Sequence, residues 1–137
     1  MDLTGSVQAR IRWENVCVSQ QEFLEVWDRA GQGGVELAQL TNDWHDQAVA
    51  QTCRWLAAVP MRTALCGGMT RSPVTGRACL ASRDVIEAEW NAACRGGFTA
   101  DLAVRRSWSD AVVATLRWAW RGQAPVPVLA NATARPN

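Results

Sequence analysis

Glycine and proline residues divide this chain into short segments, four of which carry apolar residues at helical spacing. The first segment begins at Ser19 with the sequence Ser-Gln-Gln-Glu, a capping box in which the serine and the glutamate satisfy backbone amides at a helix start. Phe23, Trp27 and Ala30 then share one face, and Gly31 supplies a stop signal. These residues predict a helix between the serine and the glycine.

Three further segments follow the same pattern. Residues 41–60 offer several N-cap residues, a long apolar face and a terminating proline, while residues 82–97 run from a serine cap to a pair of glycines. Residues 107–122 carry an apolar stripe that ends before a glycine. We therefore expect a mainly α fold, a compact domain of about four helices in which the second is central.

The remaining segments are less regular. Residues 7–18 alternate loosely and predict either a short strand or an extended lead-in, and residues 35–40 predict a short helical turn or an edge segment. Residues 69–80 read either as a loop or as one small β-hairpin. Pro125 and Pro127 prevent the segment after Gly122 from continuing a helix. We therefore expect a single helical domain over 1–122, followed by a loose, flexible C-terminal tail at 123–137.

Composition excludes several classes of protein. With 48% hydrophobic and 20% charged residues among 137, the chain has enough apolar content to form a core. It has no apolar run of the roughly 20 residues that a membrane span needs, and its first residues lack the pattern of a secretory signal. Its five cysteines contain no close pair, which predicts reduced, mostly buried thiols. We expect a cytoplasmic protein without a membrane partner.

Charge is distributed unevenly along the chain, although the net charge is only +1. Residues 1–53 hold three basic and eight acidic side chains, whereas residues 54–137 hold eleven basic and five acidic ones, and every basic residue is an arginine. The stretch 47–83 contains no acid, and its arginines are candidate contacts for phosphate or nucleic acid. The alternative is that the acidic and basic halves fold against each other. The five arginines are Arg54, Arg62, Arg71, Arg77 and Arg83.

No residues form a recognisable catalytic or metal-binding pattern. His45 lies between Asp43 and Asp46 at a helix start, where the carboxylates complement the helix dipole and the histidine points elsewhere. The cysteine spacings do not match a zinc site. Residues 67–77 contain glycine, serine, threonine and two arginines, which favours a plain surface loop or, alternatively, a phosphate cradle without the order of a Walker loop. We expect neither an enzyme nor a bound cofactor or metal.

Eight of the ten aromatic residues are tryptophan. Trp118 lies about 200° around a helix from Leu116, which predicts an outward direction between Arg117 and Arg121. Exposed tryptophan beside arginine is typical of a protein-interface hot spot and also of base stacking. The alternative is that residues 125–127 cover this ring. The assignment of Trp13 stays open, and the tryptophans expected in the core are Trp27, Trp44, Trp55, Trp90, Trp108 and Trp120.

The second half of the chain contains the sequence Ser-Pro-Val-Thr-Gly-Arg at residues 72–77, a capped helix that follows it, and residues 115–122 with a proline-containing end after them. In these features it resembles short uncharacterised proteins of actinobacterial genomes and their phages or mobile elements. An arginine-only basic set fits a genome rich in G and C. The resemblance implies no activity and no functional residue.

The leading hypothesis is a non-catalytic, cytoplasmic protein-binding domain, adaptor or inhibitor-like, that contacts another protein through Trp118, Arg117 and Arg121. The alternative is a nucleic-acid-binding protein that uses the acid-free arginine stretch. Association into a homo-oligomer is compatible with either hypothesis.

Overall fold

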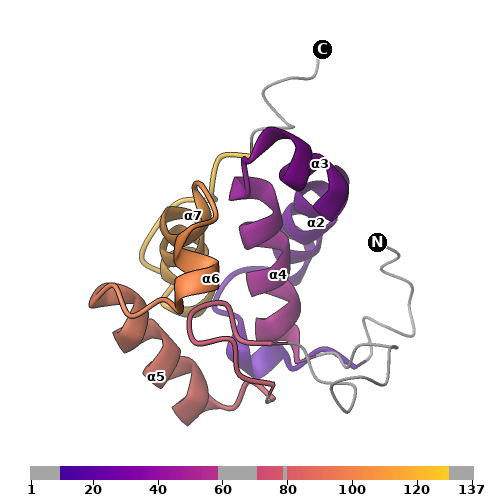
Figure 1. Ribbon diagram of the computed structural model, residues 1–137. Coiled ribbons are helices and arrows are strands. Elements are labelled where there is room, and N and C mark those ends of the chain that lie inside the picture. Colours follow the sequence, from indigo (N-terminus) through magenta and orange to yellow (C-terminus); the bar gives the residue numbers. More distant parts are fainter. Residues whose placement is uncertain (1–9, 59–70, 79, 130–137) are drawn as a thin grey trace.

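The computed structural model describes residues 10–58, 71–78 and 80–129, and all regular secondary structure in these ranges is helical (Figure 1). This confirms the expected mainly α fold. The helices are α2 (Gln20–Gly31), α3 (Gly34–Thr41), α4 (His45–Ala57), α5 (Arg83–Cys94), α6 (Ala100–Ala103) and α7 (Trp108–Thr115), together with the 3₁₀ turn η1 (Trp13–Asn15) and the π-helical segment η3 (Leu116–Trp120).

Helix α4 is central, as predicted. It packs against α2 on one side and α7 on the other, and Figure 1 shows α5 beyond α6 and α7. The side chains of Val49, Thr52 and Leu56 are fully buried, because the helix is covered on more than one face. The helix ends where Ala58 adopts a left-handed conformation (φ 57°). The predicted stop at Pro60 lies outside the described residues.

The predicted caps form the start of α2 and the ends of two later helices. The hydroxyl of Ser19 accepts a hydrogen bond from the backbone N–H of Glu22 at 3.2 Å, which is one half of the capping box. Gly96, after α5, and Gly122, after η3, both adopt positive φ, which glycine tolerates without steric cost. Local sequence signals therefore set these boundaries. Ser82 occupies the N-cap position of α5, but its side chain forms no capping hydrogen bond, so the predicted serine cap is wrong in this respect.

For three segments, the structure decides between conformations that the sequence left open. Residues 34–41 form α3, so the helical interpretation of 35–40 is correct. Residues 10–18 form an extended lead-in around η1 and no strand: the N–H of Arg12 bonds to the carbonyl of Ala57, and that of Cys17 to the carbonyl of Ala119. Helix α6 is separate from α7, because Ser107 between them has a φ of 68°.

The described part of the 69–80 segment is a tight turn. One antiparallel bridge joins Arg71 to Ala78, and the N–H of Ser72 donates to the carbonyl of Arg77 at 2.8 Å. We call residues 71–78 the turn. The rest of the predicted hairpin, at 69, 70 and 79, lies outside the described residues.

The first part of the tail packs on the helices. Residues 123–129 have no helix or strand, as the prolines predict, yet Pro127 and Leu129 are buried. Residues 130–137 lie outside the described part of the chain.

Three of the five cysteines belong to the described residues, and one of these three is buried. Cys53 is fully buried in α4, and this burial raises the pKa of its thiol strongly. Cys17 and Cys94 are free thiols on the surface, so the expectation of mostly buried cysteines is wrong for these two.

Candidate functional site

Trp118 is a core residue, and the expectation that it lies on the surface is wrong. Only 1% of its surface is exposed. Its ring stacks on Phe23 of α2, with the ring centroids 6.2 Å apart and the planes at 22°. Its indole Nε1 donates to a carboxylate oxygen of Glu22 at 3.0 Å. Trp118 is therefore unavailable as a partner contact in this fold.

Residues 116–120 are covered on two sides, so the helical wheel predicts the wrong exposure for Trp118. Leu116 is fully buried, and Trp118, two residues later, is buried against α2. The backbone also departs from α-helical geometry, since the N–H of Arg121 donates to the carbonyl of Leu116, five residues earlier, at 2.9 Å. What remains accessible on this segment is Arg117, which is exposed, and Trp120, which is half-buried.

Arg117 and Arg121 lie against a different tryptophan, Trp90 of α5. The guanidinium carbons are 5.9 and 5.8 Å from the centroid of the Trp90 ring, within the range of cation–π attraction. Arg121 also forms an ion pair with Glu87 at 3.3 Å, and Glu87 accepts a hydrogen bond from Nε1 of Trp120 at 3.1 Å. We call Trp90, Arg117, Trp120 and Arg121 the arginine–tryptophan surface.

The expectation that Trp90 and Trp120 belong to the core is wrong in part, because both are half-buried and only pack against its edge. Their sequence signal was ambiguous: each lies on an apolar stripe, but at the side of it. Arg117 and Arg121, four residues apart in the sequence, were the informative signal that this segment reaches the surface.

A cleft of about 550 Å³ adjoins the arginine–tryptophan surface, and we call it the arginine cleft. Arg12, Arg83 and Arg121 line it from three different parts of the chain, with the carboxylates of Glu14 and Glu87. Glu87 pairs with Arg121. The guanidinium groups of Arg12 and Arg83 therefore share the cleft with one remaining carboxylate, that of Glu14. Neither Arg12 nor Arg83 forms an ion pair with a described residue. The cleft is therefore suited to an acidic group.

The structure separates the arginines of the acid-free stretch. Arg83 lines the arginine cleft, whereas Arg71 lines a second cleft beside α6. Arg54 is half-buried in α4, and this burial lowers the pKa of its guanidinium. Arg77 is exposed in the turn, and Arg62 lies outside the described residues.

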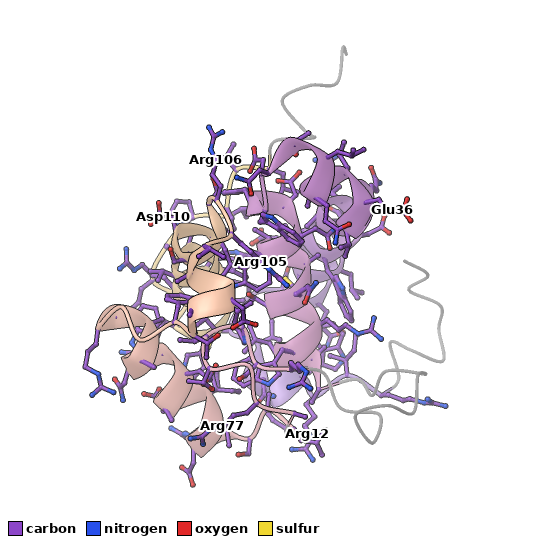
Figure 2. All side chains as sticks on the ribbon, in the orientation of Figure 1. Arg12, Glu36, Arg77, Arg105, Arg106 and Asp110 are labelled. Atoms are coloured by element: carbon purple, nitrogen blue, oxygen red, sulfur yellow. The ribbon has the colours of Figure 1, made fainter. Side chains whose placement is uncertain are left out.

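Charged side chains mark two ends of the molecule. Figure 2 shows Arg12 and Arg77 at the lower end, and Glu36 with Arg106 at the upper end. Helix α3 lies at the upper end (Figure 1), and its Leu37 and Leu40 are 50% and 85% exposed. This apolar helix face is the clearest surface feature that the sequence analysis missed.

His45 has a local structural role. Its backbone N–H donates to the Asp43 carboxylate at 3.2 Å, and its Nδ1 lies 3.2 Å from the Asp46 carboxylate. His45 therefore points toward Asp46, and the expectation that it points away from both aspartates is wrong. The two aspartates serve the start of α4, as their positions suggested. Within the described ranges, no three histidine, cysteine, aspartate or glutamate side chains lie close enough to hold a metal ion.

Glu89 is a second residue that the sequence analysis missed. It is 4% exposed, and its carboxylate accepts hydrogen bonds from the backbone N–H groups of Val74 and Thr75 at 3.0 and 3.1 Å and from the Thr75 hydroxyl at 2.5 Å. The sequence did contain a signal for the burial of Glu89. The residue lies on the apolar stripe of α5, three residues after Ile86 and four before Ala93. Glu89 fixes the turn to α5.

Comparisons with protein-family models, curated proteins and solved structures find no match for this chain. Among the described helices, none has the length and apolar character that crossing a membrane requires. A proposal about function therefore depends on the geometry of the described residues.

Proposed function

We propose that this chain is a non-catalytic binding protein of the cytoplasm and that it contacts another protein through the arginine–tryptophan surface. The observation that carries the proposal is the placement of Arg117 and Arg121 against the half-buried ring of Trp90. Tryptophan and arginine are the residues most enriched at interface hot spots. Free thiols at Cys17, Cys53 and Cys94 fit a reducing compartment.

Two side chains of this surface are already held in place by polar contacts. The Trp120 indole is fixed by its hydrogen bond to Glu87, and Arg121 by its ion pair with the same carboxylate. Binding therefore immobilises fewer free rotamers than it would on an unstructured surface, which reduces the entropic cost of association.

The arginine cleft indicates the chemistry of the partner. Arg12 and Arg83 lie beside the surface without a carboxylate partner of their own. An aspartate or glutamate of the partner could form charge-assisted hydrogen bonds with them. We infer a partner segment that places an apolar side chain against Trp90 and an acidic one in the cleft.

The test compares two charge reversals in the full-length chain. Arg117→Glu reverses an exposed arginine of the surface, and Arg106→Glu reverses an exposed arginine at the upper end of the molecule (Figure 2). Tagged wild type and both variants are used for affinity purification from the native host with nuclease treatment, followed by mass spectrometry. We expect a protein captured by the wild type and by Arg106→Glu to be lost with Arg117→Glu.

The two variants also define the result that contradicts the proposal. Equal capture by all three proteins would place the interface elsewhere. A further variant, Leu40→Gln, changes the exposed face of α3, and loss of the partner with this variant alone would assign the interface to α3. Melting temperatures measured in parallel show whether each variant is folded.

Nucleic-acid binding is the second candidate, because Arg12, Arg83 and Arg121 converge beside the ring of Trp120 in one cleft. Arginines can neutralise phosphates while an aromatic ring stacks on a base. Fluorescence titration with single-stranded and double-stranded oligonucleotides should then show an affinity that falls steeply with salt. No binding at low ionic strength would eliminate this candidate.

A further inference from the structure

A second cleft, separate from the arginine cleft, lies between the turn, α4 and the segment that joins α6 to α7. Its volume is about 240 Å³, and one of its walls is formed by Arg71, Ser72, Pro73, Thr75 and Gly76. We call it the turn cleft. Part of the glycine-, serine- and arginine-containing loop singled out in the sequence therefore lines a cavity.

Two guanidinium groups from distant parts of the chain line the turn cleft. Arg105 lies over the rings of Trp44 and Trp108, with its guanidinium carbon 4.3 and 4.8 Å from the two centroids. Figure 2 shows Arg105 near the middle of the molecule, above the turn. Arg71 donates from Nη1 to the carbonyl of Gly76 at 2.9 Å. Both arginines are thus oriented by contacts within the protein.

Thr99 contributes a buried hydroxyl without a partner. The residue lines the turn cleft, and its Oγ1 has no hydrogen-bond partner among the described residues. Its backbone N–H donates to the carbonyl of Val74 at 3.0 Å, which fixes its position. The Oγ1 atom is enclosed by protein atoms, so it donates to a bound anion only after the Thr99 side chain turns toward the cleft. A buried hydroxyl without a partner is unfavourable, which favours this change when an acceptor is bound.

The wall formed by the turn is rigid. Glu89 accepts three hydrogen bonds from Val74 and Thr75, and Nε1 of Trp108 donates to the carbonyl of Pro73 at 2.9 Å. A binding site on this wall needs little rearrangement before a ligand enters.

One carboxylate, Asp101, also lines the turn cleft. Two arginines against one aspartate leave the cleft positive, which favours an anion. The aspartate can accept a hydrogen bond only from an anion that still carries a proton. At neutral pH, monohydrogen phosphate carries a proton and sulfate does not.

We propose that the turn cleft binds a phosphate group, with Arg71 and Arg105 as its cationic contacts and Thr99 as a hydroxyl donor. The cleft is smaller than the roughly 300–1,000 Å³ of pockets that enclose drug-sized ligands, so inorganic phosphate or a small phosphate monoester fits better than a nucleotide. The proposal is independent of the protein-binding proposal, because the two sites have no lining residue in common.

Isothermal titration calorimetry of the full-length chain tests the site with three probes at constant ionic strength: inorganic phosphate, glycerol 2-phosphate and sulfate. We expect saturable binding of phosphate, and affinity for sulfate lower by about tenfold because Asp101 repels it. Tighter binding of the monoester would identify an esterified phosphate as the natural ligand. Equal affinity for phosphate and sulfate, or no saturation by either phosphate probe, would overturn the proposal.

Two variants and a matched control assign the binding to this cleft. Arg71→Ala should weaken phosphate binding by about tenfold or more, as expected for the loss of a charge-assisted contact. Thr99→Val, which keeps the side-chain volume, should weaken it by several-fold. Arg77→Ala removes an exposed arginine from the same turn and outside the cleft, and should leave the affinity within about twofold. An equal loss in Arg71→Ala and Arg77→Ala would indicate non-specific attraction and contradict the site.

Discussion

Replacing Trp118 by alanine should strongly destabilise the protein. The side chain is 1% exposed and stacks on Phe23, so its removal leaves a cavity between η3 and α2. A buried tryptophan removes about 150–250 Å² from water, which at about 25 cal/mol per Å² corresponds to roughly 4–6 kcal/mol. Measured truncations of buried aromatic residues cost about 3–5 kcal/mol. We therefore expect a loss of about 4 kcal/mol in the free energy of unfolding.

Two companion variants separate the contributions to this value. Trp118→Phe keeps an aromatic ring near Phe23 but loses the hydrogen bond to Glu22, so it should cost about 1–2 kcal/mol. Trp120→Ala removes a ring of the same size that is only half-buried, and should cost roughly half as much as Trp118→Ala.

Urea unfolding followed by far-UV circular dichroism measures these differences. For a domain of this size, the loss in Trp118→Ala also corresponds to a fall in melting temperature of roughly 10–15 °C. If Trp118→Ala proved no more destabilising than Trp120→Ala, the burial of Trp118 against α2 would be refuted.

Three further predictions concern other parts of the structure. Glu89→Ala should cost about 3 kcal/mol in urea unfolding, because it leaves buried N–H groups of the turn without an acceptor, whereas Glu89→Gln should cost about 1 kcal/mol; similar losses would argue against the hydrogen-bonding role. Because burial raises the pKa of Cys53, iodoacetamide at pH 8 should modify Cys17 well before Cys53, and peptide mapping that found equal rates would contradict the burial. Gly122→Ala should lower stability by about 1–2 kcal/mol, since φ is 65° and the new Cβ would lie 3.2 Å from the Cβ of Cys17; an unchanged urea midpoint would exclude this strain.

Helix positions could be predicted from the sequence because their signals are local. The Ser19 cap and the glycine after η3 each act within a few residues of their own position, so no tertiary information is needed to interpret them. The short helix α3 was less predictable, since its Leu37 and Leu40 face solvent and give no amphipathic stripe toward a core.

The exposure of individual side chains could not be predicted in the same way. A helical wheel gives the direction of Trp118 relative to Leu116, but it does not show that a second helix covers the opposite side. The π-helical hydrogen bond of η3 depends equally on its surroundings. Arg117 and Arg121 were singled out as neighbours of Trp118, but the ring they lie against, Trp90, belongs to a helix 27 residues earlier in the chain than Arg117.

The polar interactions between distant segments were the least predictable part. The contacts of Glu89 with the turn span 14 and 15 residues, and those of Asn15 with the carbonyls of Leu56 and Ala81 span 41 and 66 residues. Such pairs follow from tertiary packing, which one sequence does not reveal. The charge asymmetry between the halves of the chain indicated basic surface, but not that Arg12 of the acidic half would share a cleft with Arg83 and Arg121 of the basic half.

We propose that the arginine–tryptophan surface contacts a protein partner. Hydrogen–deuterium exchange of the purified chain, alone and with the captured partner, tests it most directly. Partner binding should slow exchange in residues 85–94 and 116–123 and leave exchange in α3, at residues 34–41, unchanged. Protection confined to α3, with unchanged exchange in the other two segments, would contradict the claim.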